Sequence, residues 1–130
     1  MQTDNLLLRA LRMNAMFSSI SALALLAAAP WLAVQLGLNT AVPVYVVGAG
    51  LILFALQLWN IVRTRQIRAW EVRGIIGGDL AWVVCSAVLV ALFYSQMTLP
   101  GLLLVDLVAI AVLYFAIQQF RGLRQLQRAG

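Results

Sequence analysis

Two aspartates stand in apolar stretches of the sequence and are the residues best placed to do chemistry. Asp79 opens the segment DLAWVVCSA directly after two glycines, and Asp106 lies within LLLVDLVAI. A carboxylate among apolar side chains has to be protonated, paired or hydrogen-bonded. Each aspartate is therefore a candidate for handling a proton or a cation, and each has a structural alternative.

For Asp79 the alternative is a helix cap. Gly77 and Gly78 are poor residues for a helix interior, so a helix is expected to start at Asp79. Its carboxylate would then accept hydrogen bonds from the free amides of the first turn.

Asp106 is too far along its apolar run to be a cap. It lies six residues beyond Pro100, which places it about 9 Å into a helix at 1.5 Å per residue. No basic side chain occurs inside any of the long apolar runs. We expect Asp106 to be protonated or paired, with Tyr45 as the candidate partner. It would either handle a proton or cation, or fix packing as a buried hydrogen-bonded acid.

Further polar side chains occur near one end of each apolar run. They are Asn14, Ser21, Gln57, Asn60, Asp79, Ser86, Gln118 and Gln119, and we take the first seven as an expected inner polar layer. At helical spacing several share a face, so they would line a polar cavity or hydrogen-bond between helices. Two aromatic residues, Trp82 and Tyr114, lie deep in the runs, and their polar atoms need partners within the bundle.

The composition is that of a membrane protein. Of the 130 residues, 64% are hydrophobic and 10% are charged, whereas soluble domains have about 45–50% and 25%. Four continuous apolar runs, residues 14–38, 43–62, 76–96 and 100–120, are long enough to cross a bilayer as helices. The predicted fold is one all-α domain, a bundle of four transmembrane helices made of two tandem hairpins.

The charges predict how the chain is threaded. All nine basic residues are arginines, and the connections LGLNTAV and SQMTLP carry no charge. By the positive-inside rule, both termini are cytoplasmic. Frequent Ala, Leu and Arg without Lys is typical of a GC-rich bacterial gene, so we expect an inner (plasma) membrane. Seven arginines are expected near anionic lipid headgroups: Arg63, Arg65, Arg68, Arg73, Arg121, Arg124 and Arg128.

The N-terminal residues 3–13 precede the first apolar run and are predicted to form a short amphipathic helix at the membrane interface. Thr3, Asp4 or Asn5 would cap it. Leu7, Leu8 and Leu11 lie on one side of this helix, and two arginines lie on another.

The two hairpins are similar to each other in sequence. Residues 14–22, NAMFSSISA, align without a gap on residues 79–87, DLAWVVCSA, and FALQLWNIVR aligns on FAIQQFRGLR. A tandem duplication would relate the hairpins by a pseudo-twofold axis along the membrane normal. Apolar helices also match by chance, so the repeat is a hypothesis.

The sequence lacks the groups that many enzymes and metal sites need. It has no histidine and one cysteine, Cys85, which we expect to be a small packing residue. This excludes an internal disulfide, bis-histidine haem and multi-cysteine metal sites. No serine-hydrolase, zinc-peptidase or phosphate-loop motif occurs. We expect no cofactor, no metal, no catalytic residue and no nucleic-acid partner.

Three functions stay open. The leading hypothesis is a non-enzymatic accessory or assembly subunit, or a lipid-binding bundle, whose partner is lipid, another membrane protein or a second copy. The alternatives are a small proton- or cation-coupled transporter or channel that uses Asp106, and a membrane enzyme acting on a lipid or quinone. In length and helix count the chain resembles several families of small four-helix membrane proteins, among them the small multidrug-resistance transporters. The glutamate that defines the first helix of that family has no counterpart in NAMFSSISALALLAAAP.

Overall fold

The computed structural model describes residues 6–129, and within that range the chain is helical and contains no strand. α1 (Leu6–Ala27) and α3 (Val42–Thr64) form the first hairpin, and α4 (Ala69–Phe93) and α5 (Leu99–Ala129) form the second. α2 (Ala29–Gln35) and the 3-10 turn η1 (Tyr94–Gln96) lie in the connections within the hairpins. The predicted all-α class is confirmed, and four helices are long and apolar enough to cross a membrane.

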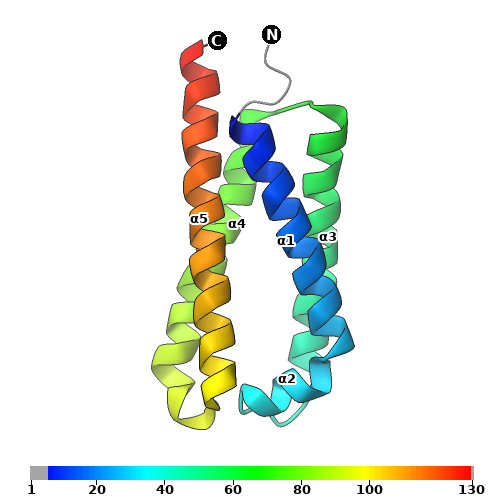
Figure 1. Cartoon of the computed structure of the whole chain (residues 1–130), viewed down its shortest axis with the longest axis vertical. Helices are drawn as coiled ribbons and strands as arrows, with labels where there is room; N and C mark the ends of the chain where they lie inside the picture. The colour runs from blue at the N-terminus through cyan, green and yellow to red at the C-terminus, as the bar shows by residue number, and fades with distance from the viewer. Residues whose placement is uncertain (1–5, 130) are drawn as a thin grey trace.

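The two ends of the bundle differ in charge. The start of α1, the end of α5 and the α3–α4 connection lie together at one end, where the arginines are, and we call it the basic end (Figure 1). α2 and η1 lie at the opposite end, which we call the uncharged end. The seven arginines expected near lipid headgroups are all exposed.

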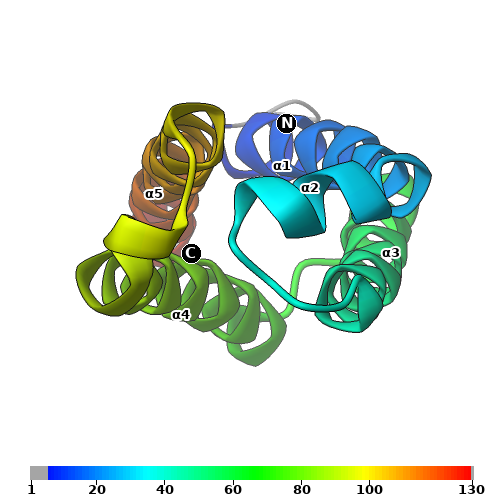
Figure 2. The ribbon, with the colours of Figure 1, turned by 90° about the horizontal axis from the view of Figure 1, so that it is seen from below.

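The first apolar run is divided into two helices. Pro30 has no amide hydrogen and falls in the first turn of α2, where that donor is not needed. α2 lies across the uncharged end of the bundle and does not continue the direction of α1 (Figure 2).

The N-terminal segment is not a separate interfacial helix. Its described part forms the first two turns of α1, and Leu7, Leu8 and Leu11 are buried in the core. The apolar side of this segment therefore faces the other helices of the bundle. The expected cap residues Thr3, Asp4 and Asn5 lie outside the described residues.

α4 begins at Ala69, seven residues before the apolar run expected from 76. Asp79 therefore lies inside the helix, and the expectation that it caps the helix is wrong. The capping position is Arg68, and the helix runs without a break through Gly77 and Gly78. Each helical glycine costs about 1 kcal/mol relative to alanine. Val72, Ile75 and Ile76 are buried in the core just before the glycines, and this packing holds the segment helical.

The main core lies at the basic end, where helices of both hairpins meet. Its buried members are Leu7, Leu11, Ala15, Leu58, Ile61, Val72, Ile75, Ile76, Ala116 and Leu123. The hairpins approach closely at Gly122 of α5, where a Cβ atom would lie 2.7 Å from the Cα atom of Leu7. α1 and α5 are therefore in direct backbone contact at this point.

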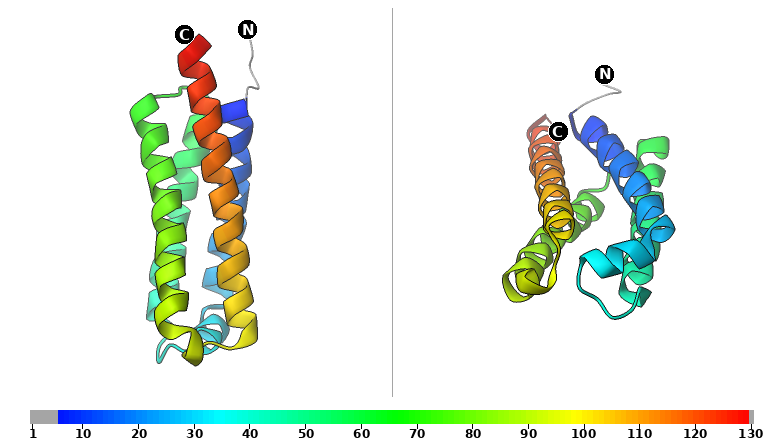
Figure 3. Two further views of the ribbon diagram at one scale, coloured as in Figure 1. Left: turned by 90° about the vertical axis from the view of Figure 1, so that its left-hand side faces the viewer. Right: turned by 60° about the horizontal axis from the view of Figure 1, so that its bottom comes forward.

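The hairpins pack against each other along one side. α1 packs along both α3 and α5, and α4 packs along α5, whereas α3 and α4 do not pack side by side. Figure 3 shows the hairpins as separate pairs of helices. At the uncharged end they are joined by the backbone amide of Thr98, which donates to the carbonyl of Gln35 at 3.0 Å.

The outside of the bundle is apolar. Each of the four long helices exposes large hydrophobic side chains, including Ile20, Leu53, Leu92 and Leu107. Cys85, expected to be a small packing residue, is also exposed and does not pack within the bundle.

Replacing Gly122 with alanine is expected to destabilise the bundle, because the new Cβ atom would meet the backbone of Leu7. Overpacking of this kind costs about 1–3 kcal/mol. Gly74→Ala is the matched control, since nothing lies within 4 Å of a Cβ atom there. Thermal unfolding in detergent, followed by helical circular dichroism, should show a lower midpoint for Gly122→Ala alone. Equal midpoints for the two variants would contradict the close α1–α5 contact.

Candidate functional site

Polar side chains from three helices hydrogen-bond one another inside the bundle. Asn14 of α1 donates from Nδ2 to Oδ2 of Asp79 in α4 at 2.9 Å and to Oε1 of Gln119 in α5 at 2.8 Å. Gln119 donates from Nε2 to the same Asp79 oxygen at 2.8 Å. Ser18, one turn beyond Asn14, donates to Asn14 Oδ1 at 3.1 Å. We call these four residues the polar cluster.

The polar cluster is almost completely removed from solvent. Asn14 is 1% exposed, Gln119 0% and Asp79 4%. Among the described residues, no fully buried side-chain nitrogen or oxygen lacks a hydrogen-bond partner. A buried hydrogen-bond network of this kind fixes one arrangement of the helices that contribute to it. It connects α1 of the first hairpin to both helices of the second.

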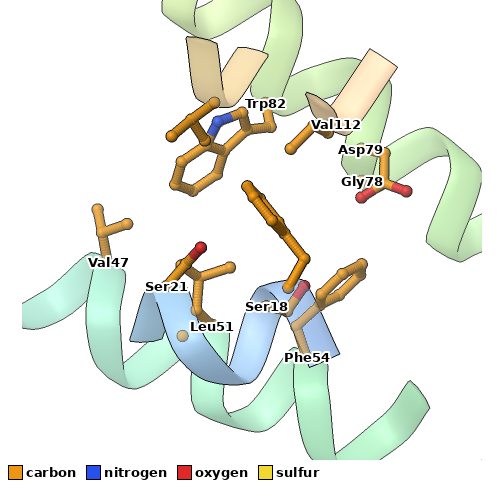
Figure 4. Close-up of a pocket in the computed structure, with 12 residues that line it drawn as sticks. Ser18, Ser21, Val47, Leu51, Phe54, Gly78, Asp79, Trp82 and Val112 are labelled. Carbon is orange, nitrogen blue, oxygen red and sulfur yellow. The ribbon is translucent and has the colours of Figure 1, made fainter. Parts of the chain in front are cut away.

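Asp79 keeps one carboxylate oxygen free. Both amide donors of the cluster are directed at Oδ2, and Oδ1 has no hydrogen-bond partner among the described residues. No described arginine forms an ion pair with this carboxylate either. Figure 4 shows the Asp79 side chain in the wall of a pocket, beside Gly78 and Val112. Oδ1 is thus available as an acceptor for a group inside that pocket.

The pocket is the narrow end of a larger apolar cavity between the hairpins. The part beside Asp79 has a volume of about 300 Å³, and the part toward the uncharged end has about 400 Å³. The two parts are contiguous, because they share the lining residues Ser21, Val47, Leu51, Trp82 and Val108. Most of the wall is aliphatic, with Leu25, Leu32, Leu89 and Leu104 toward the uncharged end.

The cavity reaches the surface on the side where α3 and α4 do not pack. Gly50 of α3 and Gly78 of α4 both line it, and both are exposed. Nothing lies within 4 Å of a Cβ atom built on Gly50. On the α4 side, Phe54 lies 3.6 Å from a Cβ atom built on Gly78. Gly50 therefore leaves a lateral opening into the cavity, whereas at the level of Gly78 the side chain of Phe54 in α3 reaches α4.

The expected inner polar layer is brought together only in part. Asn14 and Asp79 are in direct contact, and Ser21 and Ser86 line the cavity. Gln57 and Asn60 are exposed on α3, where Asn60 accepts a hydrogen bond from Arg63. Gln118 is half-buried and outside the cluster.

Gln119, which the expected layer left out, takes the place assigned to Gln118. The sequence alone does not single it out, because almost every position of this apolar stretch could face inward; in the structure the buried positions are Phe115, Ala116, Gln119, Gly122 and Leu123. A glutamine in this series faces the interior, whereas its neighbour is turned away by about 100°.

The two deep aromatic residues have different surroundings. Trp82 is half-buried and forms part of the wall in both halves of the cavity. Tyr114 is 51% exposed on α5 and has no hydrogen-bond partner among the described residues. The Trp82 indole also has no hydrogen-bond partner among the described residues, so the expectation that both polar groups find partners inside the bundle is wrong for both; Tyr114 faces outward on α5.

Asp106 is not part of the cavity. Its neighbours Leu104, Val105 and Val108 line the cavity wall, whereas Asp106 is exposed on the other side of α5. The expected pairing with Tyr45 is not formed, since α3 and α5 do not pack together.

Within residues 6–129 there is no group of three or more histidine, cysteine, aspartate or glutamate side chains that could hold a metal ion. The arrangement is suited to holding an amphipathic molecule, with apolar walls and a carboxylate at one end. Comparison of the chain with protein-family models, with curated proteins and with solved structures finds no match.

Removing the Asp79 carboxylate is expected to destabilise the protein more than removing an exposed polar group. Asp79→Ala removes the acceptor of one N–H group on each of two buried amides, and each unpaired N–H group costs about 1–3 kcal/mol. Asp79→Asn keeps an oxygen for both donors and should retain most of the stability. The free energy of unfolding in detergent measures these differences. Asn60→Ala, on the exposed side of α3, is the control, and its free energy of unfolding should lie within about 0.5 kcal/mol of the parent. A loss for Asp79→Ala no larger than that for Asn60→Ala would contradict the role of the cluster.

Proposed function

We propose that the chain is a multi-pass protein of a bacterial inner (plasma) membrane and that it binds a lipid between its two hairpins without catalysing a reaction. Four helices of sufficient length and apolarity, and an apolar exterior, support the membrane placement. The arginines at the basic end support an orientation with both termini in the cytoplasm.

We also propose that the hairpins are tandem repeats. Buried residues recur at the offset of 65 that aligns α1 with α4, as in the pairs Leu7 and Val72, and Leu11 and Ile76. Asn14 and Asp79 are related by the same offset, and they hydrogen-bond to each other. Equivalent positions on two repeats meet in this way when they lie close to a twofold axis.

The observation that carries the lipid-binding proposal is the apolar cavity that opens sideways between α3 and α4. A molecule in the bilayer can enter through this opening without leaving the hydrocarbon. The α1–α5 pair, which is the repeat-related counterpart of α3 and α4, is closed by the contact of Gly122 with Leu7. The two equivalent sides of the bundle thus differ, and the open one gives access to the cavity.

The polar cluster gives a ligand its preference for the cavity over the surrounding bilayer. Lipid tails are as apolar as the cavity wall, so burying a tail gives little preference for the site over the bilayer. A hydrogen bond to the free Asp79 oxygen does favour the site, because few groups at that depth of the bilayer can form such a bond. Asp79 lies six residues beyond Arg73 on α4, about 9 Å from the arginine level and just inside the headgroup layer. The ligand should therefore carry a hydroxyl or amine donor next to its acyl chain.

Transport through Asp106 has less support, because Asp106 does not line the cavity. Among the residues that line it, Asp79 is the acidic one. Asp79 has no serine or cysteine nucleophile as a hydrogen-bond partner, so an enzymatic role has no specific observation behind it.

Labelling with a photoactivatable diacylglycerol tests the proposal. The full chain is placed in vesicles of phosphatidylcholine and phosphatidylglycerol, and the labelled residues are mapped by mass spectrometry. We expect labels at Trp82, Leu89 and Leu104, which line the cavity. Gly50→Leu should reduce this labelling severalfold, because the new side chain fills the open space at the entrance.

Gly74→Leu is the matched control, since Gly74 is also an exposed helical glycine with open space around it but does not line the cavity. It should leave the labelling unchanged. Labels found to the same extent on outward-facing residues such as Leu53, with no effect of Gly50→Leu, would show that the lipid binds no specific site.

A further inference from the structure

Asp106 has an unusual place on α5. It lies seven residues after Leu99 and fifteen before Arg121, which is about 10 Å from the uncharged end of the helix and about 22 Å from the arginine level. Its side chain is exposed, and its exposed helical neighbours are Leu103, Leu107 and Ile110, each more than half exposed. In the proposed membrane placement this carboxylate lies in the hydrocarbon and faces away from the bundle.

The described residues of the chain provide no partner for this carboxylate. Among residues 6–129 no hydrogen bond or ion pair involves Asp106, and all nine basic residues of the sequence flank the apolar runs at the opposite end. Charged side chains in membrane helices face a bundle interior, a wet cavity or a partner of opposite charge. The cavity lies on the other side of α5, where Val105 and Val108 line it. The carboxyl group is then either protonated or paired with a group outside this chain.

We propose that the face of α5 formed by Leu103, Asp106, Leu107 and Ile110 docks a transmembrane helix of a different protein, and that this helix carries a lysine, arginine or histidine at the depth of Asp106. Charge complementarity determines the choice of occupant, because an ion pair in hydrocarbon neutralises both side chains. The inference uses the proposed membrane placement, and it does not depend on whether the cavity binds a lipid.

A second copy of this chain fits the face less well. With both termini on the same side of the membrane, two copies would bring one Asp106 carboxylate toward the other. The nearest arginine of α5 is four turns away, and the sequence has no lysine or histidine. A dimer would therefore need its carboxylates protonated, whereas a basic partner pairs with the ionised form.

The surroundings of Asp106 also allow a close approach. Ala109, one turn further along α5, is half-buried, and a small side chain at this spacing lets a second helix backbone come near. Leu107 and Ile110 would then flank the ion pair and exclude lipid from it.

Binding of synthetic transmembrane helices tests the inference. The full chain, labelled with a fluorophore, is placed in phosphatidylcholine vesicles with a leucine–alanine peptide that carries one lysine at the depth of Asp106. Controls are the same peptide with leucine at that position, and a peptide with its lysine moved toward the opposite leaflet. Energy transfer measures association. We expect the first peptide to bind about fivefold more tightly than either control, and Asp106→Asn to remove the difference.

Further measurements separate loss of the docking face from unfolding of the variant and from self-association of the chain. Asp106 is exposed, so Asp106→Asn should unfold at the same temperature as the parent, and Leu53→Asn on the exposed face of α3 should not change peptide binding. Equal binding of the three peptides would overturn the inference. Energy transfer between two copies of the chain that is lost in Asp106→Asn would overturn it in favour of a homodimer. Lipid labelling of the cavity is a separate measurement on the other side of α5, so either proposal can fail without the other.

Discussion

The hydrogen bonds that Asn14 and Gln119 donate to Asp79 are the interaction on which the packing of the hairpins depends. One carboxylate oxygen accepts from two helices at once, at 2.9 and 2.8 Å, and the same two amides are bonded to each other. Helices in hydrocarbon have no water-driven force between them, so polar contacts and close packing decide how they associate. The cluster determines which faces of α1, α4 and α5 meet, and the contact of Gly122 with Leu7 follows nearer the basic end, one turn further along α5 and two turns back along α1.

The same cluster accounts for the open side of the bundle. Its members come from α1, α4 and α5, and α3 contributes none. α3 is held by α1 instead, and at the basic end its Leu58 and Ile61 reach the shared core. Toward the uncharged end α3 and α4 do not pack side by side, and Gly50 leaves open space on the α3 side of the gap. An apolar cavity with one polar end follows from this unequal packing.

The fold class could be predicted from the sequence because long apolar runs have few alternatives to helices. The start of α4 could not, since two glycines indicate a helix end locally while Val72, Ile75 and Ile76 are buried in a core that forms from distant residues. Asn14 and Asp79 could be identified from the repeat alignment. The burial of Gln119 and the exposure of Asp106 could not be predicted. Both depend on which face of α5 is turned toward the other helices, and a helix that is apolar all round does not reveal this.

The central claim is that a lipid tail lies between the hairpins and that its polar end meets Asp79. A crystal structure of the full chain grown from a lipidic phase would test it most directly. The account predicts an elongated ligand that passes between α3 and α4, along Trp82 and Leu89, with a polar atom within hydrogen-bonding distance of Asp79 Oδ1. Close packing of α3 against α4, in the way that α1 packs against α5, with no ligand between the hairpins, would contradict it.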